Sequence, residues 1–135
     1  MISAVDTSVI LDVLSGRSPF CDVSQQSLRR ARAEGKLIIC ECVLAEVYPA
    51  LDDEQLFIEF LQDWQLHFEP SSSESAILAG KYFARYLQRG GEQKQVLPDF
   101  LIGAHAQILA DRLLARDRGY FRDYFTALAV IDPSK

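Results

Sequence analysis

The stretch that decides the fold is ISAVDTSVILDVL, residues 2–14. Its first four residues, 2–5, form a short apolar run with β-branched members, and such a run predicts a buried strand. Asp6 follows directly. From residue 7 the apolar side chains recur at helical spacing until Gly16, which predicts a helix that ends at that glycine. A strand that passes through one acidic residue into a helix is therefore the first unit of the chain.

Short apolar runs and helical spacings alternate along the rest of the chain. The runs predict strands at residues 37–39, 66–68, 113–115 and 128–131. The helical spacings and capping residues predict helices at residues 24–34, 42–51, 56–64, 73–87 and 98–110. This order predicts an α/β fold with a mainly parallel sheet and helices on both faces. In such sheets, ligands bind beyond the carboxyl ends of the strands.

Length and composition limit the class of protein. The 135 residues predict one domain over residues 1–135, and an apolar fraction of 49% is enough for a full core. There is no run of about 18 apolar residues, so we expect no membrane-spanning helix. The first residues lack the basic segment of a signal peptide, and we expect a cytoplasmic protein. The net charge of −5 argues against a broad basic surface for nucleic acids but permits an acidic metal site.

Four acidic residues stand close to the ends of predicted elements. Asp6 follows the first strand and Asp117 follows the strand near residue 115, so both belong to the carboxyl edge of the sheet. Asp99 lies in the first turn of the last predicted helix, and Glu46 lies on the border of the apolar arc of its helix. Like charges that crowd together raise one another's pKa values, so four carboxylates need a compensating cation. Oxygen ligands without His or Cys favour Mg²⁺ or Mn²⁺.

Each acid also has an interpretation without a metal. Asp6 is a suitable cap for the helix that follows it. Asp99 is favoured in a first turn by the helix dipole. Asp117 precedes Gly119 and suits a turn, while Glu46 suits a solvated helix face. The metal hypothesis therefore depends on all four acids facing one edge together.

Four segments of the chain carry a resemblance to a known family. They are residues 5–8 (VDTS), the lone Glu46 within a helix, residues 99–106 (DFLIGAHA) and residues 115–121 (ARDRGYF). Together, and in this order, they resemble the PIN-domain ribonucleases, and among these the VapC toxins of bacterial and archaeal toxin–antitoxin pairs. The resemblance runs through almost the whole chain.

The resemblance implies a three-layer α/β/α sandwich that cleaves RNA with Mg²⁺ or Mn²⁺. It also implies a cognate antitoxin and a homodimer. Carried over residue by residue, it makes Asp6, Glu46, Asp99 and Asp117 the catalytic and metal-binding acids, with Ser8 in support. The family usually has Thr or Ser where this chain has Ala115, so one hydroxyl contact to the site is missing here.

Other charged or polar residues have two interpretations each. Arg116 and Arg118 flank Asp117 and are candidates for phosphate contact, or they are solvated surface charges. His105 lies inside a predicted buried helix, and we expect it to be packed and hydrogen-bonded. The three cysteines are odd in number and lack a CxxC pair, so we expect free thiols.

Three other functions compete with the ribonuclease. Haloacid-dehalogenase-like phosphatases need a second Asp two residues after the first, where this chain has Ser8. Receiver domains need adjacent acids and a late Lys that the sequence does not present in a recognisable place. A catalytically weak or inactive PIN-like scaffold that binds a partner or RNA is favoured by Ala115 and opposed by the intact acids.

Overall fold

One sheet of five strands organises the molecule. The computed structural model describes residues 1–92 and 95–135, and within them the strand order is β3-β2-β1-β4-β5. The strands are β1 (Ser3–Val5), β2 (Leu37–Ile39), β3 (Leu66–Phe68), β4 (Arg112–Leu114) and β5 (Val130–Ile131). Ser3 lies opposite Leu37 on one side and Arg112 on the other. Every pairing is parallel, so the predicted parallel sheet is confirmed.

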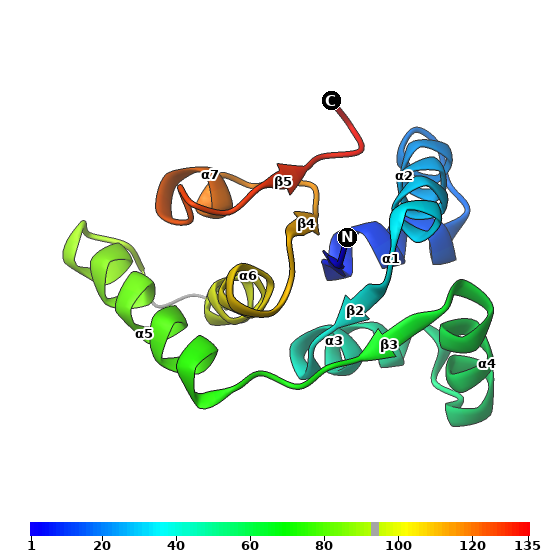
Figure 1. The fold of residues 1–135 in the computed structure, drawn as a ribbon, viewed down its shortest axis with the longest axis horizontal. Helices are drawn as coiled ribbons and strands as arrows, with labels where there is room; N and C mark the ends of the chain where they lie inside the picture. Colours follow the sequence, from blue (N-terminus) through cyan, green and yellow to red (C-terminus); the bar gives the residue numbers. More distant parts are fainter. Residues whose placement is uncertain (93–94) are drawn as a thin grey trace.

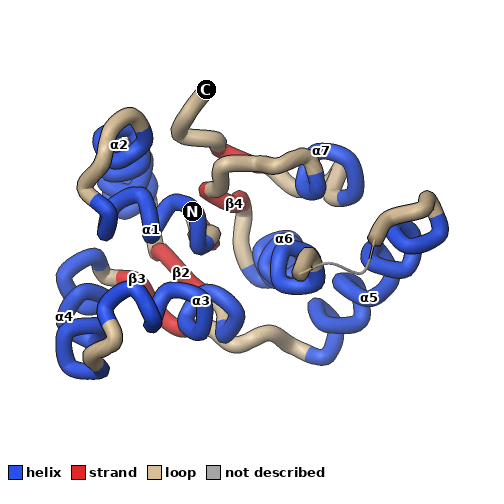
Figure 2. The backbone as a smooth tube through the Cα atoms, turned by 180° about the vertical axis from the view of Figure 1, so that it is seen from behind, coloured by secondary structure: helices blue, strands red, loops and turns tan. Residues whose placement is uncertain are grey.

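The described residues form seven helices around this sheet. They are α1 (Thr7–Ser15), α2 (Phe20–Glu34), α3 (Glu41–Leu51), α4 (Glu54–Trp64), α5 (Ser73–Gln88), α6 (Leu97–Leu109) and α7 (Tyr120–Tyr124). Figures 1 and 2 show α2 and α4 to one side of the sheet, and α5 and α6 to the other. This arrangement confirms the expected three-layer α/β/α fold. Among the described helices, none has both the length and the apolar composition needed to cross a membrane.

Capping residues set the ends of the helices that matter for the site. The side chain of Asp6 accepts a hydrogen bond from the Ser8 backbone N–H, which begins α1, and Gly16 ends this helix in the left-handed region at φ 64°. Helix α5 begins with a reciprocal capping box between Ser72 and Ser75. Pro98 lies in the first turn of α6, as the sequence predicts.

Helix α6 is largely buried and packs against the sheet. Phe100, Ile102, Ala104 and Ala106 are at most 1% exposed. A Cβ atom at Gly103 would lie 2.8 Å from the Phe125 ring, so only glycine allows this close approach. Because α6 is fixed so closely, the acid in its first turn has a fixed place relative to the sheet.

The structure departs from the sequence predictions at several boundaries. Helix α2 begins at Phe20, four residues before the predicted residue 24, because its buried Cys21 belongs to the same apolar face as the later residues. Strand β4 ends at Leu114, and β5 is shorter than the predicted strand 128–131. Helix α7 was not predicted, since five residues carry too little periodicity. Part of the expected loop at residues 89–95, residues 93–94, lies outside the described residues.

Candidate active site

A cavity of about 300 Å³ opens at the carboxyl ends of β1 and β4. It brings together side chains from α1, α3, α6 and the segment that follows β4. Its charged lining residues are three acids and two arginines: Asp6, Glu46, Asp99, Arg116 and Arg118. Parallel strands present their carboxyl ends at one edge, which is why residues so far apart in sequence meet there.

Asp6 is the least exposed of the three acids that line the cavity. It follows β1 and is 6% exposed. One of its carboxylate oxygens accepts bonds from the Ser8 backbone N–H at 3.1 Å and from the Ser8 hydroxyl at 2.5 Å. Burial raises the pKa of Asp6 above its ordinary value, while the bonds from Ser8 lower it and the charge of Glu46 raises it. Asp6 is therefore both a helix cap and a cavity acid.

Asp99 faces the cavity from the first turn of α6. It is 8% exposed, and one oxygen pairs with Arg118 Nη2 at 2.5 Å. The pKa of Asp99 is raised to about 6, mainly by burial and also by the charges of Asp6 and Glu46, while Arg118 acts in the opposite direction. The three acids thus interact electrostatically across the cavity.

Glu46 reaches the cavity from the exposed face of α3. Its carboxylate accepts a hydrogen bond from the Thr7 hydroxyl at 2.7 Å. This bond joins the start of α1 to α3. It orients the Glu46 carboxylate at the cavity. Sequence reasoning did not single out Thr7.

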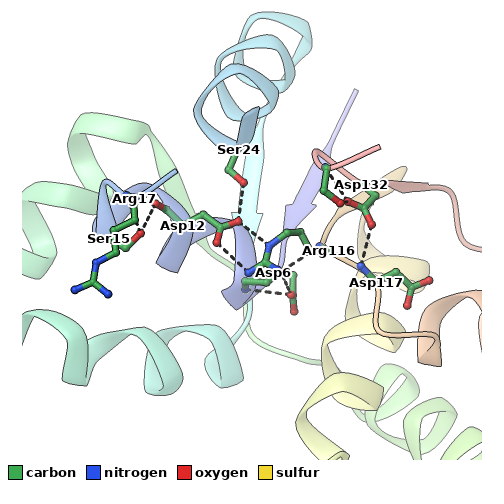
Figure 3. Close-up of polar contacts among 10 residues, drawn as sticks. Asp6, Asp12, Ser15, Arg17, Ser24, Arg116, Asp117 and Asp132 are labelled. Carbon is green, nitrogen blue, oxygen red and sulfur yellow. Dashed lines mark hydrogen bonds and ion pairs between the residues drawn. The ribbon is translucent and has the colours of Figure 1, made fainter. Parts of the chain in front are cut away.

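The carboxylate of Asp117 lies outside the cavity lining. It accepts backbone N–H bonds from Gly119 at 2.7 Å, Phe121 at 3.3 Å and Arg122 at 2.9 Å. These donors belong to the start of α7, so the carboxylate caps this helix. Figure 3 shows it pointing away from Asp6. The structure therefore brings three of the four predicted acids together, and Asp117 makes the contacts of a turn and cap residue.

The two arginines are held differently. Arg116 Nε and Nη2 donate to the two oxygens of Asp12 at 2.8 and 3.0 Å. The guanidinium of Arg118 pairs with Asp99, and its side chain is 71% exposed.

Sequence reasoning missed Asp12. An acid within the apolar stretch VILDVL was a usable signal, because a buried carboxylate needs a partner.

A hydroxyl links the two sides of the carboxyl edge. The Ser8 hydroxyl donates to Asp6 and accepts the backbone N–H of Arg116 at 3.1 Å. Ser8 thus contacts a cavity acid and the segment after β4. Ala115, just before this link, is fully buried and offers no hydroxyl of its own.

The chemistry of the donors suits a hard cation, but their present arrangement is open. In the part of the chain that the structure describes, no three Asp, Glu, His or Cys side chains are grouped closely enough to hold a metal ion. Three carboxylates nevertheless line one cavity, and the charged group nearest to Asp99 is a guanidinium. Arg118 is bonded to one of the two Asp99 oxygens.

Comparison with known families agrees with this edge-of-sheet site. A PIN-domain family model matches residues 4–125. The chain belongs to the PIN-domain family. Proteins with this domain are generally nucleases, so the resemblance found in the sequence is confirmed at the level of the family. Comparison with curated protein sequences gives no significant match.

Solved structures share the PIN fold of this chain. A chain of VapBC2 from Rickettsia felis, bound to a DNA fragment from its promoter, is 21% identical with a TM-score of 0.74, covering 97% of this chain and 98% of that one. A chain of VapBC-1 from nontypeable Haemophilus influenzae is 16% identical with a TM-score of 0.76 and full coverage of both, 100% each. A chain of FitAcB from Neisseria gonorrhoeae is 19% identical with a TM-score of 0.69, covering 99% of each. At these identities the likeness concerns the fold.

Proposed function

We propose that this PIN domain is a Mg²⁺- or Mn²⁺-dependent endoribonuclease, the toxin of a type II toxin–antitoxin system. The observation that carries the proposal is the convergence of Asp6, Glu46 and Asp99 on one cavity that two arginines also line. An acidic pocket with nearby guanidinium groups suits the cleavage of a phosphodiester, because it offers ligands for a metal and donors for a phosphate.

Asp6, Glu46 and Asp99 are the residues that would hold the metal. Their oxygen ligands match the preference of Mg²⁺ and Mn²⁺. A bound divalent ion activates a water molecule and neutralises charge on the scissile phosphate. The protein's own contribution is to keep Asp6 in place through Ser8 and Glu46 through Thr7. In this proposal Asp117 joins the site only after its carboxylate leaves the start of α7.

Arg116 and Arg118 are the proposed phosphate contacts. Two of the five N–H groups of Arg116 donate to Asp12, and the other three are outside this pair. Arg118 is exposed and pairs with one acid, so it is able to turn toward an approaching phosphate. Positive groups are needed here because the chain as a whole carries a net charge of −5.

An antitoxin is the proposed protein partner. The solved structures with the same fold include VapBC complexes, which supports a partner of this kind. Leu56 and Ile58 on α4 are 50% and 40% exposed, and they offer apolar contacts to an amphipathic segment. A basic side chain of that segment would fit the cavity acids. We further expect a homodimer in the cytoplasm.

The decisive experiment measures cleavage of a labelled RNA by the purified chain. Cleavage is expected with Mg²⁺ or Mn²⁺, and EDTA should abolish it. Asp99→Asn should be inactive in the same assay. Cleavage that persists in EDTA would contradict the metal mechanism.

A growth experiment tests the toxin assignment. Expression of the chain alone should slow growth, and co-expression of the neighbouring gene should relieve this growth defect.

A second candidate is a PIN scaffold with weak or no catalysis that binds a partner or RNA. One observation favours it: the Asp117 carboxylate caps α7 and does not line the cavity. The two candidates differ in a single-turnover experiment with excess protein. The nuclease converts all bound RNA when Mn²⁺ is added, whereas the scaffold binds it and leaves it intact.

A further inference from the structure

Asp12 is a buried acid beside the candidate site that the proposed mechanism does not use. It lies one helical turn after Ser8 on α1 and is 8% exposed. Its carboxylate accepts both Arg116 bonds and a third bond from the Ser24 hydroxyl at 2.8 Å. Ser24 belongs to α2 and is fully buried. Figure 3 shows Asp12 between Ser24 and Arg116.

Both the guanidinium and the backbone of Arg116 are held by further neighbours. Its guanidinium lies over the Phe20 ring, 4.1 Å from the centroid, while its backbone N–H is held by the Ser8 hydroxyl. The side chain is still 34% exposed and lines the cavity. A planar guanidinium that is paired, stacked and partly open toward a cavity has its remaining N–H groups directed in advance.

We propose that Asp12 is a positioning residue that holds the Arg116 guanidinium as a fixed phosphate subsite for the RNA chain. The inference rests on the proposed function, because it names the part of that site which receives the substrate backbone. Immobilising a flexible arginine before binding lowers the entropy lost when the phosphate arrives. A purely structural pair needs no exposure, and a well-packed apolar pair often stabilises a fold as well or better. The opening of this pair toward the cavity is what favours a binding role.

The sign of one substitution separates this role from simple electrostatics. Asp12→Asn removes a negative charge near the proposed RNA site, so charge alone predicts equal or tighter RNA binding. The proposed positioning role of Asp12, here called the anchor, predicts weaker binding, because Arg116 loses the bidentate acceptor that orients it. Glu34→Gln is the matched control: Glu34 pairs with Arg112 at 3.0 Å at the opposite end of the same strand, outside the cavity.

The test uses fluorescence anisotropy of a labelled single-stranded RNA, with Ca²⁺ in place of Mg²⁺. Arg116→Gln should raise Kd about tenfold, as expected for the loss of a charge-assisted contact. Asp12→Asn should raise it about fivefold, and the double variant should match Arg116→Gln, because Asp12 acts only through Arg116. Glu34→Gln should bind as tightly as the wild type or slightly tighter.

Several outcomes overturn the proposal. Unchanged or tighter binding by Asp12→Asn does so, as does additive weakening in the double variant. A wild type that binds no RNA also overturns it. Where Asp12→Asn fails to fold, Phe20→Leu decides: it keeps both charges and removes the ring under Arg116, and about twofold weaker binding is expected. A wild type that binds RNA without cleaving it in Mn²⁺ contradicts the nuclease proposal and leaves the anchor standing.

Discussion

The two sides of the cavity hold positive charge in opposite ways. On the α1 side, defined by Ser8, Asp12 and Arg116, the guanidinium is paired with a buried carboxylate through two bonds and stacked on a ring. On the α6 side, defined by Asp99 and Arg118, a 71% exposed guanidinium meets an acid that is itself a proposed metal ligand. Arg116 is therefore held by several contacts, whereas Arg118 is held by one ion pair and is largely exposed.

The proposed function gives this pocket two tasks, and the difference between its two sides separates them. A phosphate subsite benefits from a donor that does not move, because orientation is established before binding. The proposed metal site would need Asp99 to be available to a cation. In the structure Arg118 pairs with Asp99, and its charge offsets part of the repulsion among the acids. Substitutions on each side of the cavity are therefore expected to have separate effects.

The largest expected effect is the loss of cleavage in Asp6→Asn. The Asp6 carboxylate accepts a hydrogen bond from Ser8 on the α1 side, and it is a proposed metal ligand. We expect RNA cleavage to fall at least about 100-fold, since even an outer-shell change at a metal site costs up to this factor. The metal-free variant should melt no lower than the wild type, because Asn caps a helix as well as Asp and carries no buried charge. Equal activity in the two proteins would remove Asp6 from the mechanism.

The second effect concerns pH and the α6 side. The pKa of Asp99 is about 6 in the folded chain against an ordinary 3.8, so the folded state holds this proton more tightly than the unfolded state. The resulting stability is full below about pH 4 and is lost as pH rises to about 6, an effect on the order of 2–3 kcal/mol. Urea unfolding in EDTA at a series of pH values should show this loss in the wild type relative to Asp99→Asn.

Other carboxyls with shifted pKa values are present in both proteins: burial raises the pKa of Asp6, and two further carboxyls have lowered pKa values. Glu41 and Asp132 have pKa values below their ordinary range. Burial acts to raise both values, but hydrogen bonds from Ser71 to Glu41 and from Ser134 to Asp132 lower them. Their stability is lost as pH falls, in the opposite direction, and it is present in both proteins under comparison. A wild-type curve parallel to that of Asp99→Asn between pH 4 and 7 would contradict the raised pKa.

The acids at strand and helix ends were predictable because position and residue type agree. Asp6 follows a buried strand, and Asp99 follows the proline that begins a helix. The contacts that orient the cavity were not predictable in the same way. The partner of Asp12 is 104 residues away, and no local pattern pairs two residues across that distance.

The place of Asp117 shows a different limit. Its position after a strand predicted an edge residue, and it lies at that edge. Its side-chain direction depends on α7, a five-residue helix whose free N–H groups attract the carboxylate. A helix this short has no detectable apolar period, so neither the helix nor its cap was visible in the sequence.

A pair of variants at Asp117 tests whether the cavity gains a fourth acid. Asp117→Ala removes the acceptor of three backbone N–H groups, and the free energy of unfolding should fall by about 1 kcal/mol. Asp117→Asn keeps a capping oxygen and should cost less. If the carboxylate joins the metal during catalysis, Asp117→Asn should still reduce cleavage about tenfold. Full activity of this variant would confine Asp117 to its capping role.

The smallest expected effect bears most directly on the exchange of charge at Asp99. Arg118→Gln removes the guanidinium that competes with a cation, so Mn²⁺ should bind about threefold more tightly, within the range for one exposed ion pair. Calorimetric titration with Mn²⁺ in the absence of RNA measures this without any cleavage. Arg122→Gln is the matched control, because Arg122 is 75% exposed and pairs with Asp123 outside the cavity, and the change in net charge is the same. Tighter Mn²⁺ binding in both variants would reflect net charge alone. Weaker binding in Arg118→Gln would mean that Arg118 helps to hold the acids in place, and the two sides of the cavity would then be alike.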